Sequence, residues 1–137
     1  MIAFGKTSGV AVAAMSYLAE HRDGPPVTSA EVGRARGYSA AHVAKVLSRL
    51  SSAGLVDGAR GPRGGYRLAR PAGAISLAEV IEPFEGNRQN IVCPFGPNWC
   101  GVREPCPLHD QMVTLHENNR RALEKMTLDV FCHEAAV

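Results

Sequence analysis

Apolar side chains spaced three and four residues apart predict two amphipathic helices in the first half of the chain. The first lies between Gly9 and His21, and Ser8 is placed to cap its start. The second begins at Ser39 and ends at Gly54. Its apolar stripe is formed by Val43, Val46, Leu47 and Leu50.

Two Ser/Thr-x-x-Glu patterns mark the starts of further helices, because the two side chains of such a capping box satisfy each other's backbone N–H groups. Thr28 and Glu31 open a short helix that Gly37 closes, so a single tight turn separates it from the next helix. Ser76 and Glu79 open a fourth short helix. Helix, glycine turn and amphipathic helix together predict a helix-turn-helix.

Two short stretches after the second amphipathic helix alternate between apolar and polar residues, as strands do. Residues 55–60 (LVDGAR) and 66–70 (YRLAR) predict a hairpin, and the glycines of residues 61–65 (GPRGG) permit a tight tip. Such a hairpin is the wing of a winged helix-turn-helix. The sequence therefore predicts a mainly α fold with a small β-hairpin wing.

A long helix is predicted near the C-terminal end. From Pro107, a favourable first helical residue, apolar positions recur at spacings of three and four as far as Val130. One seam of this helix is formed by Leu108, Met112, Leu115, Asn119, Ala122 and Met126. Burial of the seam against a second copy predicts a homodimer. The alternative is that the stripe packs on its own domain.

Charge is distributed unevenly along the chain. Residues 1–72 carry ten Lys/Arg and four Asp/Glu, whereas residues 73–137 carry five and nine, so a basic half precedes an acidic half. A basic half is expected to face a polyanion. No apolar run approaches the length of a membrane span, and the N-terminus lacks the features of a signal peptide. We therefore expect a cytoplasmic protein with no membrane partner.

The basic half contains candidates for contacts with double-stranded DNA. A helix-turn-helix places its second helix in the major groove, where Ser39, His42 and Lys45 offer short polar and basic groups. Arg60 and Arg63 lie at the hairpin, from which arginines reach the backbone or a minor groove. The full predicted DNA-binding set is Thr28, Ser39, Ala40, His42, Lys45, Arg49, Arg60, Arg63, Gly64 and Tyr66. The alternative is that these charges form only a solvated surface.

Three of the four cysteines are clustered. Cys93, Cys100 and Cys106 lie in residues 86–106, which we interpret as a loop because they show no periodicity, and His109 follows. Thiolates in a reducing compartment favour an iron–sulfur cluster or zinc. The spacing is wider than the Cys-x2-Cys typical of zinc ribbons, but it leaves zinc open. Cys132 lies far from this group and is predicted to pack or to remain a spare thiol.

The second helix and the hairpin resemble those of a known family. Residues 38–56 (YSAAHVAKVLSRLSSAGLV) and 60–69 (RGPRGGYRLA) look like the recognition helix and wing of the IscR, NsrR and RirA type of iron–sulfur winged-helix transcription regulators, and the resemblance spans nearly the whole chain. It implies that Ser39 and His42 approach bases or phosphates and that Arg60 enters the minor groove. Ala41 and Ala44 replace polar or acidic residues of relatives such as IscR, so the operator sequence cannot be copied from a relative.

The resemblance also implies a cofactor. The family holds an iron–sulfur cluster on three cysteines of similar spacing, which favours a cluster over zinc at Cys93, Cys100 and Cys106. In the IscR branch, a histidine three residues after the last cysteine completes a [2Fe-2S] site, and His109 stands at that position. The NsrR branch uses an acidic residue near the partner's N-terminus for a [4Fe-4S] cluster, whereas residues 6–8 (KTS) here contain no carboxylate. We therefore expect [2Fe-2S] rather than [4Fe-4S], with zinc as the alternative.

The expected organisation is a DNA-binding domain in residues 1–85, a cluster-binding loop in 86–106, and a dimerisation helix with a C-terminal tail in 107–137. The expected function is that of a regulator, acting as a repressor on a palindromic operator, whose DNA affinity is controlled by a cluster sensing redox, nitric oxide or iron status. Two alternatives stay open: a cluster-free regulator based on thiols or zinc, and a small thiol oxidoreductase. No Cys-x-x-Cys motif, carboxylate pair or phosphate loop supports an enzyme, and no catalytic residue is predicted.

Overall fold

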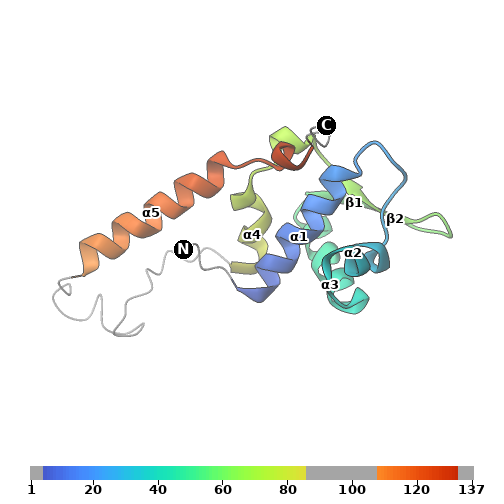
Figure 1. The fold of residues 1–137 in the computed structure, drawn as a ribbon, viewed down its shortest axis with the longest axis horizontal. Helices are drawn as coiled ribbons and strands as arrows, with labels where there is room; N and C mark the ends of the chain where they lie inside the picture. The colour runs from blue at the N-terminus through green and yellow to red at the C-terminus, as the bar shows by residue number, and fades with distance from the viewer. Residues whose placement is uncertain (1–4, 86–107, 133–137) are drawn as a thin grey trace.

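The computed structural model of the protein describes residues 5–85 and 108–132. Its elements are helices α1 (Lys6–Glu20), α2 (Ser29–Arg36) and α3 (Ala40–Ser52), strands β1 (Val56–Ala59) and β2 (Gly65–Leu68), the 3₁₀ turn η1 (Ala72–Ala74), helices α4 (Leu77–Glu85) and α5 (His109–Lys125), and the 3₁₀ turn η2 (Leu128–Phe131). The prediction of a mainly α fold with a two-stranded wing is confirmed (Figure 1). Within these ranges, no helix combines the length and apolar composition needed to cross a membrane.

The hydrophobic core forms around α1, which contacts α2, α3, α4, β2 and η2. One face of α1 is buried along its whole length, from Val10 to Ala19. The predicted stripe of α3 packs against it, and Val43, Val46, Leu47 and Leu50 are all fully buried. Burial of these four side chains leaves the opposite face of α3 in solvent, which is the arrangement that a recognition helix requires.

The turn between α2 and α3 follows from local sequence. The Thr28 hydroxyl accepts a hydrogen bond from the Glu31 N–H at 3.1 Å, and the Ser39 hydroxyl accepts one from the His42 N–H at 3.2 Å, so both predicted N-caps are confirmed. Gly37 ends α2 in the left-handed conformation, with φ +80°. These caps fix where one helix stops and the next begins.

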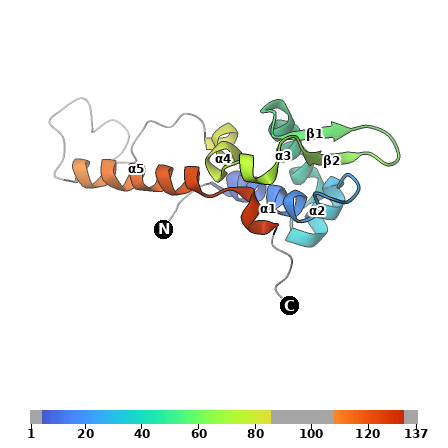
Figure 2. The ribbon, with the colours of Figure 1, turned by 90° about the horizontal axis from the view of Figure 1, so that it is seen from above.

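The wing is an antiparallel hairpin in which Val56 pairs with Leu68 and Ala59 pairs with Gly65. Its base is tied to the body, because Val27 and Tyr66 exchange two backbone hydrogen bonds of 3.0 and 2.7 Å. The tip extends away from the helices (Figure 2). Gly64 is required there, since a Cβ at this position would lie 2.4 Å from the Ala59 carbonyl oxygen.

The predicted start of the first helix is wrong. α1 begins at Lys6, and Gly5 is its N-cap without a side-chain bond, so Ser8 lies inside the helix and is buried. The Ser8 hydroxyl and the Gly5 N–H both donate to Oε1 of Glu85, each at 2.7 Å. A carboxylate from the end of α4 therefore provides the cap that the local sequence does not.

The predicted end of the last helix is also wrong. Apolar spacing continues to Val130, but α5 ends at Lys125 and Met126 has extended dihedral angles. The Met126 carbonyl accepts from the Leu77 N–H at 2.8 Å, and the Leu128 N–H donates to the Ile75 carbonyl at 3.0 Å. Leaving the helix at Met126 allows Leu128 to become fully buried in the core. Pro107, the predicted first residue of this helix, lies outside the described residues.

Candidate nucleic-acid interface and metal site

The exposed face of α3 brings the predicted DNA-reading side chains together. Ser39, Ala40 and Lys45 are exposed at the N-terminal half of the helix, and His42 is half-buried beside them. The backbone N–H groups of the first turn carry partial positive charge, which favours a nearby phosphate. This face therefore offers a hydroxyl, an imidazole and an ammonium group to a nucleic acid.

The wing places two arginines at the far end of the hairpin. Arg60 and Arg63 are exposed, and no ion pair involving either one is found among the described residues. Gly61, between them, has φ +106°, and together with Gly64 it permits the tight turn. The two guanidinium groups are thus available for phosphate or groove contacts.

Three other members of the predicted DNA-binding set have partners inside the protomer. Thr28 caps α2 through its hydroxyl. The half-buried Tyr66 ring packs against the hydrophobic core. Arg49 stacks its guanidinium over the Phe84 ring of α4, with Cζ 5.8 Å from the ring centroid. Each of these side chains therefore has a structural role in holding the DNA-binding half together.

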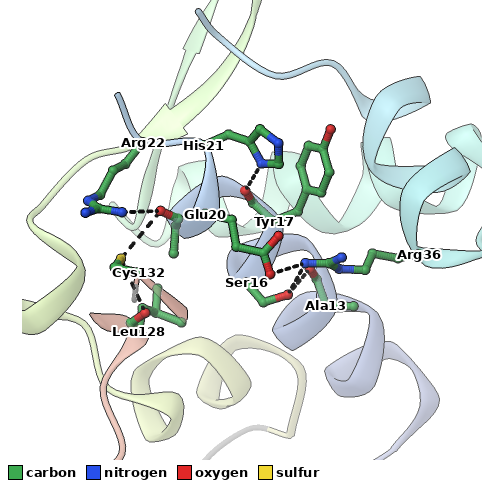
Figure 3. Close-up of polar contacts among 10 residues, drawn as sticks. Ala13, Ser16, Tyr17, Glu20, His21, Arg22, Arg36, Leu128 and Cys132 are labelled. Carbon is green, nitrogen blue, oxygen red and sulfur yellow. Dashed lines mark hydrogen bonds and ion pairs between the residues drawn. The ribbon is translucent and has the colours of Figure 1, made fainter. Parts of the chain in front are cut away.

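One arginine of the helix-turn-helix was not singled out by sequence reasoning. Arg36, in the last turn of α2, donates to Glu20 at 2.8 Å and to the Ser16 hydroxyl at 3.2 Å, and it lies over the Tyr17 ring (Figure 3). These contacts join α2 to α1 and commit the guanidinium to the protein rather than to DNA. No local pattern signals them, because sixteen residues separate Arg36 from Glu20.

The predicted metal ligands are only partly visible. Cys93, Cys100 and Cys106 lie outside the described residues, and within the described ranges no group of three metal-ligating side chains occurs. His109 is the first residue of α5. Its Nδ1 is buried and has no hydrogen-bond partner. An unpaired buried ring nitrogen costs free energy, and a metal bond would satisfy it, so His109 fits the predicted ligand role.

Cys132 is remote from that position. Its Sγ lies 3.4 Å from the Ala19 carbonyl oxygen and 3.8 Å from that of Leu128, and the side chain is packed against the core (Figure 3). It follows the C-terminal end of α5, whereas His109 begins that helix. The seventeen residues of α5 span roughly 26 Å. The prediction that Cys132 packs is confirmed, and it cannot share a metal with His109 within one protomer.

Comparison with known proteins gives the family. The model of the Rrf2 family, described as an iron-dependent transcriptional regulator, matches residues 4–134. The HTH-type transcriptional regulator IscR of Xenorhabdus nematophila is 34% identical over 119 residues, which cover 87% of this chain and 72% of the relative. CymR, the global cysteine regulator of B. subtilis, has a TM-score of 0.80 at 22% identity, over 94% of this chain and 95% of its own.

A second solved structure, T. potens IscR, has a TM-score of 0.75 at 24% identity, covering 93% of this chain and 83% of its own. The solved structures share the winged-helix fold, and the curated relatives are transcription regulators without enzymatic activity. Together with the helix-turn-helix and its basic wing, these findings show that this chain belongs to the Rrf2 family and is a DNA-binding transcriptional regulator rather than an enzyme.

Proposed function

We propose that this regulator is a repressor whose operator affinity is controlled by an iron–sulfur cluster held by Cys93, Cys100, Cys106 and His109. The observation that carries the proposal is the buried, unpartnered Nδ1 of His109. Buried polar atoms in native proteins have partners, so this nitrogen implies a group that is bound in the working protein. The family description as an iron-dependent regulator and the IscR name of its relatives support iron as that group.

The donor set favours a [2Fe-2S] cluster. Three thiolates and one neutral imidazole are ligands for iron–sulfur centres, and zinc with the same four ligands is the alternative. When bound, the cluster supplies a redox-active and nitric oxide-reactive group. The contribution of the chain is to fix the imidazole at the start of α5, where the first helical turn limits its rotation.

Control of DNA binding requires two states with different operator affinity. The DNA-binding surface is formed by Ser39, His42 and Lys45 on α3 and by Arg60 and Arg63 on the wing. The predicted ligands lie between this half of the chain and α5, since Cys93 follows α4 and His109 begins α5. Gain or loss of the cluster then changes how α4 and α5 are held, and α4 contacts α1 and α3 directly.

A homodimer completes the proposal. α5 extends from the body of the protomer in two perpendicular views (Figures 1 and 2), and on it Leu108, Leu115 and Met126 are 45%, 49% and 42% exposed. The remaining predicted seam residues, Met112, Asn119 and Ala122, are half-buried. The buried side chain of α5 is Leu123, so packing within the protomer covers one edge of the helix and leaves the seam open. A second α5 would bury it and pair two recognition helices on a palindrome.

The test is spectroscopy and metal analysis of anaerobically purified protein, with operator binding measured before and after cluster removal. We expect a visible chromophore, equal iron and acid-labile sulfide, and a large change in affinity. Cys93→Ala, Cys100→Ala and Cys106→Ala should each abolish or strongly reduce the chromophore, whereas Cys132→Ala should retain it. Zinc without sulfide would establish the zinc alternative and reject the cluster.

The fourth ligand has a matched control on the same helix. His109→Ala should alter the spectrum or weaken retention of the cluster, because one of four ligands is lost. His116→Ala removes an exposed imidazole two turns later and should change neither. If His109→Ala keeps an unchanged spectrum and iron content, another group completes the site.

A further inference from the structure

An exposed aromatic side chain stands at the start of the recognition helix. Tyr38 immediately precedes Ser39, the N-cap of α3, and it is 39% exposed. The other large apolar or aromatic side chains that are exposed in the described parts of the chain all belong to residues 108–130. Tyr38 is therefore the exception within the DNA-binding half, where such side chains are otherwise at least partly buried.

The backbone holds Tyr38 in a fixed position. Its N–H donates to the Gly33 carbonyl at 2.9 Å, and the Gly37 N–H donates to the same oxygen at 2.8 Å. The Tyr38 carbonyl oxygen approaches Gly33 so closely that a Cβ there would lie 2.5 Å away. Because the backbone is fixed on both sides of the turn, little conformational entropy is lost when the side chain makes an external contact.

The Tyr38 side chain has no partner among the described residues. No hydrogen bond to its hydroxyl and no ring contact is found there. The ring nevertheless adjoins the end of α3 that approaches DNA in a helix-turn-helix. Tyrosine hydroxyls are common donors to phosphate oxygens, and the partial positive charge of a helix N-terminus favours a phosphate at that place.

We propose that the Tyr38 hydroxyl donates a hydrogen bond to a DNA phosphate that flanks each half-site. The contact fixes the register of α3 on the duplex and contributes affinity without reading sequence. This inference rests on the proposed binding of duplex DNA by the α3 and wing surface. It differs from the arginine contacts in one measurable respect, since a neutral phenol displaces no condensed counterion.

The experiment compares wild-type protein with Tyr38→Phe and Arg63→Ala by fluorescence anisotropy over a range of salt concentrations. The probes are a random-sequence duplex long enough for two half-sites and the tightest duplex selected by the wild-type protein from a random library. Tyr38→Phe should weaken binding to both probes about fivefold, the value of one hydrogen bond, with an unchanged salt slope. Arg63→Ala should instead reduce that slope by about 0.9.

Tyr17→Phe is the matched control. The Tyr17 ring is stacked on His21 with centroids 4.1 Å apart, and Arg36 covers it, so its substitution should leave binding unchanged. Tyr38→Phe keeps the ring and the fold, and thermal unfolding of the variant checks this. If Tyr38→Phe binds like wild type, the phosphate contact is rejected while DNA binding by the α3 and wing surface stands. If the wild-type protein binds neither probe, both proposals fail.

Discussion

Ser8 Oγ donates a 2.7 Å hydrogen bond to Oε1 of Glu85 and thereby joins the first turns of α1 to the last residue of α4. The same oxygen accepts from the Gly5 N–H, so one carboxylate satisfies two donors at the start of α1. α1 is the central helix of the core, and Glu85 is the last described residue before the segment that contains Cys93. Movement of that segment would therefore act on the core through this carboxylate.

Loss of the Glu85 carboxylate should destabilise the protein. Glu85→Ala removes two hydrogen bonds to a charged acceptor near a helix N-terminus, and we expect a loss of about 2 kcal/mol in the free energy of unfolding. Glu85→Gln keeps an acceptor oxygen and should lose about half as much. Denaturant unfolding measures both variants. Glu82→Ala, which removes an exposed carboxylate on the same helix, is the control, and an equal effect of all three would show that the cap contributes nothing specific.

The wing arginines should determine the salt dependence of DNA binding. Arg60→Ala and Arg63→Ala should each weaken operator binding and lower the slope of log affinity against log salt by about 0.9, provided that each contacts a phosphate. Arg120→Ala is the control, because Arg120 is exposed on α5 and pairs with Glu124 at 3.6 Å. A double wing variant with wild-type affinity and slope would move the DNA contacts away from the hairpin.

A charge placed on the exposed seam of α5 should dissociate the proposed dimer. Leu115→Asp would bring two like charges together at a buried interface, at a cost of several kcal/mol. Thr114→Asp adds the same charge to an exposed position on another side of the helix and should leave the dimer intact. Sedimentation of both folded variants measures the association. A dimeric Leu115→Asp protein that still binds a palindrome would place the interface elsewhere.

Acid should weaken the start of α4 through Glu79. The pKa of this carboxyl is lowered chiefly by the hydrogen bond from the Ser76 N–H, and also by Arg70, against the opposing effect of partial burial. A depressed pKa in the folded state means that the stabilisation is present above the pKa of the unfolded chain and is lost as the pH falls through the folded value. The Arg70 and Glu79 side chains are 40% and 41% exposed, so screening keeps the contribution of the pair below about 1 kcal/mol.

Two substitutions at Glu79 separate the cap from the ion pair. Glu79→Gln retains the capping box but removes the charge, and it should abolish the acid-sensitive part while it preserves most stability at neutral pH. Glu79→Ala should lose both. Unfolding free energies measured at several pH values distinguish the two. If Glu79→Gln has the same pH profile as the wild type, the acid sensitivity arises at another group.

Local sequence determined the elements whose ends are fixed by near neighbours. At Ser76 and Glu79 both hydrogen bonds of the predicted capping box form, at 3.0 and 3.2 Å. The hairpin likewise follows from its glycines, because the backbone at the tip excludes a Cβ. Such signals are readable because the interacting groups are three or four residues apart. The DNA-binding face of α3 was predictable for the same reason, since its position follows from the buried stripe on the opposite side.

Tertiary structure decided the features that depend on residues distant in the chain. α1 begins before Ser8 because Glu85, 77 residues away, provides the acceptor for its first turn. α5 stops at Lys125 although the apolar spacing continues, because backbone pairing with Ile75 and Leu77 and the burial of Leu128 together favour an extended Met126. Arg36 is likewise committed to α1 by Glu20. Periodicity reports which face of a segment is apolar, but the partner that buries it is chosen only when the chain is folded.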